Sequence, residues 1–320
     1  MKEFIHIPDT ELTVSSIGLG TTLAGFDWDG AEADRIYDTY LDMGGNLIDT
    51  ARVYSDWIPG EIGRSERVLG DWLRRQKKRN HVIIITKGGH PRMQKPEDDI
   101  HLSRMTAADM RSDLELSLRA LGTDTIDIYL YHRDNLNQSV EEEMETMEQF
   151  RREGKIRYYG CSNWNTARMI EADAYAQSKG YRGLVADESL LNMGSKYMNP
   201  LSDDTLGYIK GSLWDYHLEN LHNLAIPFMG VASGFFHLYL HKGMESVQDS
   251  PYFTEKNIRV AERCRELMEK YHATVSQILL AFFSVQPFPC VPLYGPQNVE
   301  QLKDAMGALK LSLSPEDYAV

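Results

Sequence analysis

The stretch Val82-Ile-Ile-Ile-Thr-Lys87 is a short β-branched run that ends on a lysine, and a second such run, Ile126–His132, follows it. Between the two, Thr106 and Asp109 form a capping box at the start of an apolar helical pattern, and Gly122 supplies its stop. Two strands joined by an amphipathic helix are typical of a parallel sheet with crossover helices.

The same alternation continues along the chain, with Ser139 and Glu142 capping the next helix and Gly154 ending it. Eight strands are predicted, at Val14–Gly20, Asn46–Ala51, Val82–Lys87, Ile126–His132, Ile156–Asn163, Leu184–Leu190, Ile226–Ala232 and Cys290–Gly295. Eight strand–helix repeats match the size of a (β/α)8 barrel. We therefore predict an α/β fold, a TIM barrel that forms one domain over residues 1–320.

A doubly wound sheet is the alternative architecture, and the missing nucleotide fingerprint argues against it. The candidate segment Gly18-Leu-Gly20-Thr-Thr-Leu23 lacks the third glycine of G-x-G-x-x-G and has no acid at the right distance. One irregular stretch, Leu191 to Ala225, is too long for a plain connection. We expect a helix there, around Ser212 to Leu224, and consider the stretch a candidate wall of the substrate pocket.

The composition restricts the partners of the protein. With 34 Lys and Arg against 47 Asp and Glu, the formal charge is −13, which argues against a nucleic-acid partner held by phosphate contacts. Apolar runs such as Ile278–Phe283 are shorter than the roughly 20 residues of a membrane-spanning helix. The sequence predicts a soluble protein without a membrane partner.

The cysteines and the first residues both favour the cytoplasm. Cys161, Cys264 and Cys290 are odd in number and share no CxxC spacing, which fits reduced thiols. Pro8 and Glu11 fall where a signal peptide needs its apolar stretch.

Polar residues at strand ends are the first candidates for function in such a barrel, because the strand interiors are committed to packing. Asp49 ends the second predicted strand, with Tyr54 just after it, and Lys87 and His132 end the third and fourth. Each residue alone has an ordinary structural explanation. Their joint placement on three consecutive strands favours a functional explanation, with Asp49 and Lys87 forming an ion pair.

These four side chains make a workable proton donor. The ammonium of Lys87 is expected to lower the pKa of Tyr54 from about 10, and Asp49 to hold the lysine in place. His132 can hydrogen-bond a substrate carbonyl and stabilise the charge that develops on it. The cluster therefore suits carbonyl reduction or the reverse reaction.

At these residues the chain resembles the aldo-keto reductase superfamily, in its bacterial type. The resemblance rests on Asp49-Thr-Ala-Arg-Val-Tyr54 with Gly63-Arg-Ser-Glu66 and Gly70 after it, on Thr86-Lys87-Gly88, on Tyr131-His-Arg-Asp134 and on Gly160-Cys-Ser-Asn163. It implies a (β/α)8 barrel that binds a nicotinamide dinucleotide without a Rossmann domain, and NADPH-dependent reduction of aldehydes, ketones and sugars. It also implies that Tyr54 is the acid, assisted by Lys87, Asp49 and His132.

The resemblance further assigns a set of residues to the cofactor. They are Thr21, Thr22, Asp49, Ser162, Asn163, Glu188, Phe228, Gly230, Ala232, Gly295, Pro296, Gln297 and Gln301. Glu188 stands where the family commonly has glutamine, and when ionised it cannot donate a hydrogen bond. Phe228 replaces a tyrosine that often stacks on the nicotinamide and keeps the aromatic face.

The end of the site that would hold the adenosine also departs from the family. Val291–Leu302 resembles its 2′-phosphate loop, yet contains no Lys or Arg and includes Glu300. A phosphate dianion is usually held by cations or by helix N-terminal amides. NADP(H) is the cofactor that the resemblance implies, and NAD(H) remains an alternative.

Trp57, His90, Arg133 and Trp164 are the candidate substrate-binding residues, and the polar ones suit a hydroxyl-rich compound such as a sugar. No metal site is predicted. Two other functions stay open. One is a non-catalytic member that binds a cofactor or partner. The other is a metal-dependent hydrolase or isomerase built from Asp49, His90, His132 and Glu188, although no ligand spacing supports it.

Overall fold

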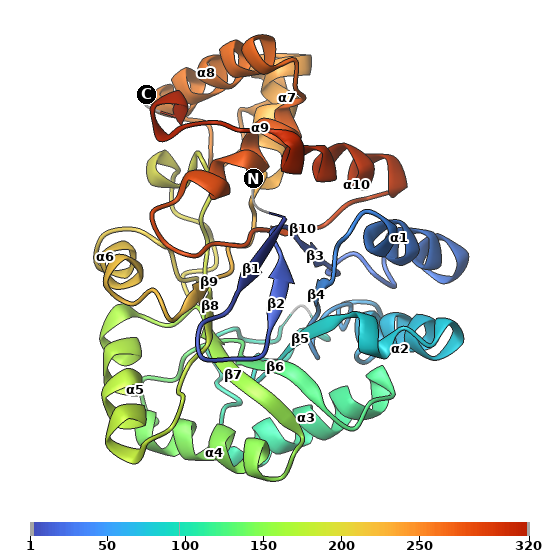
Figure 1. Ribbon diagram of the computed structural model, residues 1–320, viewed down its shortest axis with the longest axis vertical. Coiled ribbons are helices and arrows are strands. Elements are labelled where there is room, and N and C mark those ends of the chain that lie inside the picture. The colour runs from blue at the N-terminus through green and yellow to red at the C-terminus, as the bar shows by residue number, and fades with distance from the viewer. Residues whose placement is uncertain (1–2, 96, 319–320) are drawn as a thin grey trace.

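A sheet of parallel strands forms the centre of the molecule, with helices around it (Figure 1). The computed structural model describes residues 3–95 and 97–318. Its eight-stranded sheet has the order β10-β3-β4-β5-β6-β7-β8-β9. The strands are β3 (Gly18–Gly20), β4 (Leu47–Asp49), β5 (Ile83–Gly88), β6 (Ile126–Tyr131), β7 (Ile156–Ser162), β8 (Ala186–Glu188), β9 (Leu224–Ala225) and β10 (Leu293–Tyr294).

Backbone hydrogen bonds also link the two edge strands of this sheet. The amide of Ala225 in β9 donates to the carbonyl of Pro289 at 3.1 Å, and the amide of Val291 donates back to Ala225 at 2.9 Å. Just beyond β9, Pro227 accepts from the amide of Leu293 in β10 at 2.8 Å. The sheet is therefore curled, and its parallel strands bring their carboxyl ends to one side.

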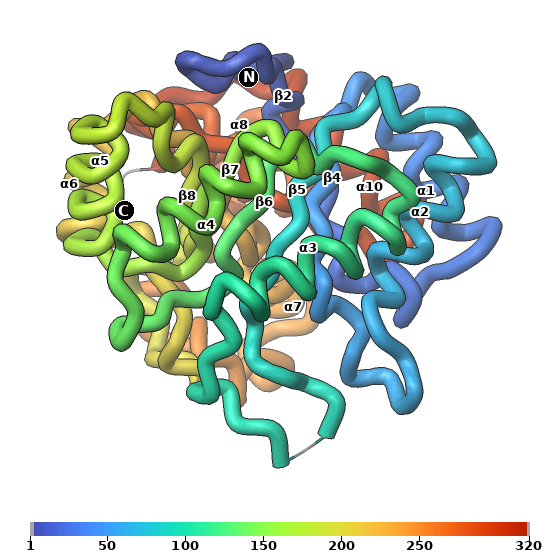
Figure 2. Tube along the Cα trace, turned by 90° about the horizontal axis from the view of Figure 1, so that it is seen from below, coloured from blue at the N-terminus to red at the C-terminus, as the bar shows by residue number. Residues whose placement is uncertain are grey.

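Ten α-helices are described around the sheet, and Figure 2 shows them from a second side. Thr106 and Ser139 accept from the amides of Asp109 and Glu142, and Gly122 ends its helix in the left-handed conformation, so the predicted helix ends are confirmed. The helices are α1 (Gly30–Asp42), α2 (Arg64–Gln76), α3 (Ala107–Leu121), α4 (Val140–Arg152), α5 (Thr166–Lys179), α6 (Ser212–Glu219), α7 (Phe235–Lys242), α8 (Glu255–Tyr271), α9 (Val275–Ala281) and α10 (Val299–Met306).

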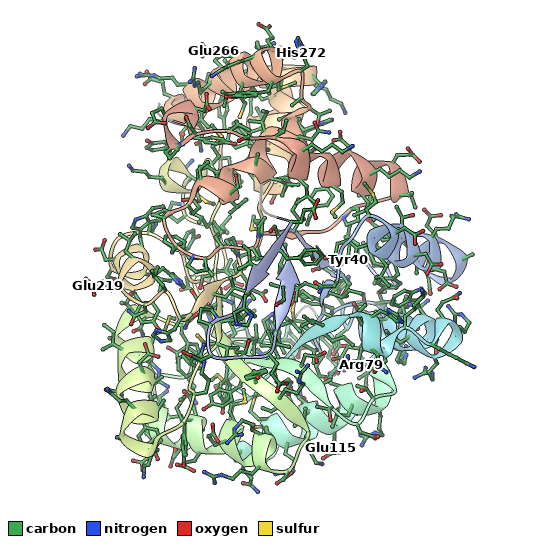
Figure 3. All side chains as sticks on the ribbon, in the orientation of Figure 1. Tyr40, Arg79, Glu115, Glu219, Glu266 and His272 are labelled. Carbon is green, nitrogen blue, oxygen red and sulfur yellow. The ribbon has the colours of Figure 1, made fainter. Side chains whose placement is uncertain are left out.

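The first predicted strand, Val14–Gly20, is wrong as a single element. Its start belongs to β2 (Thr13–Ser15), which pairs antiparallel with β1 (Phe4–His6), and its end is β3. Tyr40 of α1, labelled in Figure 3, causes the break, because its hydroxyl lies 2.8 Å from both the carbonyl of Ile17 and the side chain of Ser15. The chain therefore leaves the hairpin before it enters the sheet.

Two further boundaries differ from the prediction. The segment Ile226–Ala232, predicted as a strand, is wrong, because β9 ends at Ala225. Beyond it, Pro227 has no amide to donate, and Met229 and Ala232 have positive φ angles of 56° and 52°. The helix expected over Ser212 to Leu224 is α6, which ends at Glu219.

The hairpin β1–β2 contributes apolar side chains to the inside of the sheet. Ile7, Leu12 and Val14 are at most 2% exposed and belong to one core cluster with Leu47 of β4 and Ile85 of β5. Figure 1 shows the hairpin crossing the middle of the ring of strands. The interior is therefore filled by side chains from the strands and from the N-terminal segment.

Within residues 3–95 and 97–318, the helices are all too short or too polar to cross a bilayer.

Candidate active site

The four side chains predicted to carry chemistry lie together at the carboxyl ends of neighbouring strands. Asp49 is the last residue of β4, Lys87 lies near the end of β5, and His132 follows β6 directly. Tyr54 lies in the loop after β4, where a turn returns it toward the strands through the bond from its amide to the carbonyl of Ala51. The parallel register of β4, β5 and β6 is what brings these distant residues together.

Lys87 is the centre of the cluster. Its ammonium lies 2.6 and 2.8 Å from the two carboxylate oxygens of Asp49 and donates to the carbonyl of Thr50 at 3.0 Å. It also lies 3.1 Å from the hydroxyl of Tyr54. Lys87 and Asp49 are 0% and 1% exposed, so the predicted ion pair is confirmed and is fully desolvated.

The predicted direction of the Tyr54 pKa shift is wrong. Burial is the largest effect, and together with the charges of Asp49 and Glu188 it outweighs Lys87 and raises the pKa of Tyr54 to about 12. A phenol with that pKa keeps its proton at neutral pH. Tyr54 is therefore protonated at neutral pH and has a proton to donate. Lys87 limits how far the pKa of Tyr54 rises.

His132 is a neutral imidazole beside Tyr54. The centroids of the two rings are 5.8 Å apart, and the ring of His90 lies 4.6 Å from that of His132. Burial first, then His90 and nearby cations, lower the pKa of His132 well below its usual range, and burial lowers the pKa of His90 to about 4. A neutral imidazole can donate one N–H to an oxygen atom without giving up a proton.

These shifts give a prediction that needs no substrate. Because a lowered pKa favours the neutral form, His132 and His90 should stay neutral as the pH falls through about 6.5, where an ordinary histidine gains its proton. Nitrogen-15 NMR of the imidazole rings measures this directly. Exposed His101 is the internal control, because bonds to Asp204 and Asp99 raise its pKa. Protonation of His132 near pH 6.5 would contradict the prediction.

Glu188 is a fifth member of the cluster, and sequence reasoning missed its contact with Lys87. Its Oε1 lies 3.2 Å from the ammonium of Lys87, and it is buried at the end of β8. Its Oε2 is buried with no hydrogen-bond partner in the described part of the chain. Burial and the charge of Asp49 raise the pKa of Glu188 well above its usual range. The glutamate at a position expected to be glutamine was the signal in the sequence.

Ser162 and Asn163, predicted to contact the cofactor, are tied to neighbouring strands. The hydroxyl of Ser162 donates to the backbone carbonyl of Glu188 at 2.7 Å, and the side-chain amide of Asn163 donates to the backbone carbonyl of His132 at 3.2 Å. The side-chain oxygen of Asn163 accepts from the amide of Gly207 at 2.9 Å. The ends of three strands and the loop before α6 are thus fixed relative to one another.

The candidate substrate residues divide into two groups. Arg133 is bound by the irregular stretch before α6, at 3.0 Å from Asp203 and 2.9 Å from Thr205, and Trp57 packs edge-on against exposed Phe26. Trp164 is 0% exposed, stacks on Tyr131 and lines a cavity together with Asn163. The irregular stretch therefore contacts the site through Arg133.

The remaining residues predicted to bind the cofactor lie at the ends of the flanking strands. Thr21 is buried with its hydroxyl 2.9 Å from that of Ser65, and Thr22 is exposed. Phe228 is half-buried, Gly230 and Ala232 are buried beyond β9, and Gly295, Pro296, Gln297 and Gln301 follow β10.

The loop after β10 runs into the start of α10. Asn298 caps this helix, accepting from the amide of Gln301 at 2.9 Å, and the side chain of Gln301 accepts from the amide of Gln297. Lys303, one turn further on, lies 3.3 Å from Glu300. Its charge is therefore directed to its own helix.

The two carboxyl groups of the site contact the ammonium of Lys87. Asp49 and Glu188 both lie within 3.2 Å of Lys87, and in the described residues no group of three or more His, Cys, Asp or Glu side chains is placed to hold a metal ion. This geometry does not favour the metal-dependent hydrolase.

The sequence of this chain is similar to those of known proteins. The sequence profile of the aldo/keto reductase family matches residues 16–320. An uncharacterized oxidoreductase of Bacillus subtilis, YrpG, is 28% identical over 98% of this chain and 93% of its own length. Norsolorinic acid reductase A of Aspergillus parasiticus is 26% identical over 97% of this chain and 77% of its own. The aldo-keto reductase YhdN of B. subtilis is 34% identical over 52% of this chain and 49% of its own.

Proposed function

The chain belongs to the aldo/keto reductase family, and from that premise we propose that it is an NAD(P)H-dependent oxidoreductase that interconverts a carbonyl compound and its alcohol. The substrate class is an aldehyde, a ketone or a sugar. The single observation that carries this proposal is the shared hydrogen-bonding centre at Lys87, which holds Asp49 on one side and the hydroxyl of Tyr54 on the other, beside a neutral His132.

The residues of the chain supply the proton and the orientation. A nicotinamide, when bound, supplies or accepts the hydride. Tyr54 donates its proton to the carbonyl oxygen as negative charge develops there. The ammonium of Lys87, 3.1 Å away, stabilises the phenolate that remains, and His132 donates an N–H to the same oxygen and fixes its direction.

Polar atoms at the ends of β7 and β8 fit a carboxamide group. The buried Oε2 of Glu188 can accept a hydrogen bond from such a group. The side chain of Asn163, directly after β7, would have to exchange one of its bonds to His132, Ser162 or Gly207. These groups would hold the nicotinamide, with Phe228 as an aromatic face. Thr21, Thr22, Gly230, Ala232 and the segment Gly295–Gln301 would hold the rest of the dinucleotide.

The bonds between β9 and the segment before β10 support closure of the sheet into a complete (β/α)8 barrel, formed as one domain. The three free, buried cysteines support a cytoplasmic location. His90, Arg133 and Trp57 would contact a small hydroxyl-bearing substrate.

The loop after β10 supports NADH as a cofactor at least as good as NADPH. Val291–Leu302 contributes no cation, and the nearest lysine along the chain, Lys303, is directed to Glu300. We expect the dissociation constant of NADH, measured by nucleotide fluorescence, to be equal to or lower than that of NADPH. As a matched variant, Glu300→Arg should tighten NADPH about tenfold through one charge-assisted contact and leave NADH nearly unchanged. A wild-type preference for NADPH of tenfold or more would restore the family expectation.

A non-catalytic binding member of the family is the second candidate, and the tie between Asn163 and Gly207 is the observation that favours it. Since the oxygen of Asn163 is already occupied by the chain, a bound nicotinamide must compete for it. Mixing the protein with NADH and a panel of aldehydes, ketones and sugars separates the two functions. Nucleotide binding without turnover of any carbonyl would support the second.

A further inference from the structure

One ammonium and two carboxyl groups are buried together at the carboxyl ends of β4, β5 and β8. Lys87, Asp49 and Glu188 have side chains that are 0%, 1% and 3% exposed. In the part of the chain that the structure describes, Lys87 is the sole cation within ion-pair distance of either acid. Burying an unbalanced charge is expensive, so the cluster is expected to carry one proton more than three fully ionised groups would hold.

The contacts show which acid holds that proton. Asp49 receives two close contacts from Lys87, at 2.6 and 2.8 Å, as a carboxylate does. Glu188 has one contact with the ammonium, at 3.2 Å, and a side-chain hydrogen bond with Asp49. Two carboxyl groups can form that bond only when one of them carries a proton. Asp49 is therefore the anion and Glu188 the neutral acid.

We propose that Glu188 is a positioning residue that carries a proton. As a neutral acid it does not compete for the ammonium of Lys87, which stays bound to Asp49 and Tyr54. Tyr54 thereby remains able to donate its proton. This inference rests on the proposed carbonyl reduction and assigns the site a residue that acts through Lys87. A protonated carboxyl both donates and accepts a hydrogen bond, as a side-chain amide does.

The groups that face Glu188 support the same assignment. Asp49, Lys87 and Tyr54 act on it from β4, β5 and the loop after β4, and Arg133 after β6 lies close enough to sense its charge. Arg133 is bound by Asp203 and remains at the rim of the cluster. When Glu188 ionises at alkaline pH, it adds a negative charge beside Tyr54. That charge makes the phenol a weaker acid and slows proton donation.

The matched variant is Glu188→Gln, which keeps the shape and cannot ionise. Because Glu188 is also a candidate contact of the nicotinamide, kcat is measured at saturating nucleotide, and the comparison between the two proteins is that of the shape of the pH profile rather than of the rate at neutral pH. As the pH is raised, kcat of the wild type should fall in two steps, first as Glu188 ionises and then as Tyr54 loses its proton, whereas kcat of the variant should fall in the Tyr54 step alone. Glu148→Gln, another fully buried glutamate, is the control, and its profile should follow the wild type.

Two measurements require no turnover. The infrared difference spectrum of the wild type minus Glu188→Gln should contain the carbonyl stretch of a protonated carboxylic acid at neutral pH, because Glu66 and Glu143, whose pKa values burial also raises, contribute equally to both proteins and cancel. The ionisation of Tyr54, read as phenolate absorbance relative to a Tyr54→Phe background, should occur at a lower pH in Glu188→Gln because a negative neighbour has been removed.

The outcomes separate this inference from the proposed function. Lack of turnover on every carbonyl, with the infrared band present and the Tyr54 shift observed, would reject the reductase function and leave the role of Glu188 standing. Absence of the band, or identical alkaline behaviour of the wild type and Glu188→Gln, would overturn the inference.

Discussion

Tyr54→Phe is expected to lower kcat for carbonyl reduction about a thousandfold, because general acid catalysis typically contributes factors of 10² to 10⁴. The substitution removes only the hydroxyl that lies 3.1 Å from Lys87 and keeps the ring beside His132. Lys87 retains Asp49 and the carbonyl of Thr50 as partners, so the fold and the nucleotide affinity should be preserved.

Steady-state kinetics with NADH and NADPH, alongside nucleotide fluorescence, separates the chemical step from binding. Tyr158→Phe is the matched control, because this tyrosine lies near the start of β7, at the other end of the strand from Ser162, and bonds the amide of Glu11. Turnover of Tyr54→Phe close to that of the wild type would remove Tyr54 from the mechanism and with it the main support for carbonyl reduction.

Lys87→Met is expected to cost the fold about 3–5 kcal/mol, the usual effect of removing one partner of a buried ion pair. The methionine fills a similar volume, but Asp49 is left as a 1% exposed carboxylate facing an apolar chain. Activity should also be lost, because nothing then stabilises the phenolate of Tyr54. Urea unfolding monitored by circular dichroism measures the free-energy change.

A double variant tests the cause. Asp49→Asn combined with Lys87→Met removes both charges, so its stability loss should be clearly smaller than the sum of the two single losses. Lys303→Met, on an exposed pair with Glu300, should change stability very little. Additive losses for Asp49 and Lys87 would mean that the effect arises from packing and not from the ion pair.

The parts of the site on consecutive strands could be predicted from the sequence, because a parallel register aligns strand ends automatically. The contact between Lys87 and Asp49 could be predicted as soon as their two strands were recognised. The contact of Glu188 with the same ammonium could not be derived, because β8 reaches it across the inside of the sheet. The sequence was enough to mark Glu188 as different from the glutamine that the family resemblance led us to expect. Its contact with the ammonium of Lys87 was found only from the distances in the structure.

The direction of the Tyr54 pKa shift was mispredicted for a related reason. The sequence revealed an ammonium beside the phenol, but burial and a second carboxyl determine the net effect.

The hairpin that precedes the family match has a practical meaning for anyone who trims this protein. The family profile begins to match at residue 16, yet Ile7, Leu12 and Val14 are interior side chains. An expression boundary drawn at residue 16 would delete these three side chains and leave Leu47 and Ile85 without part of their core packing. The folding unit therefore includes residues that the family profile does not match.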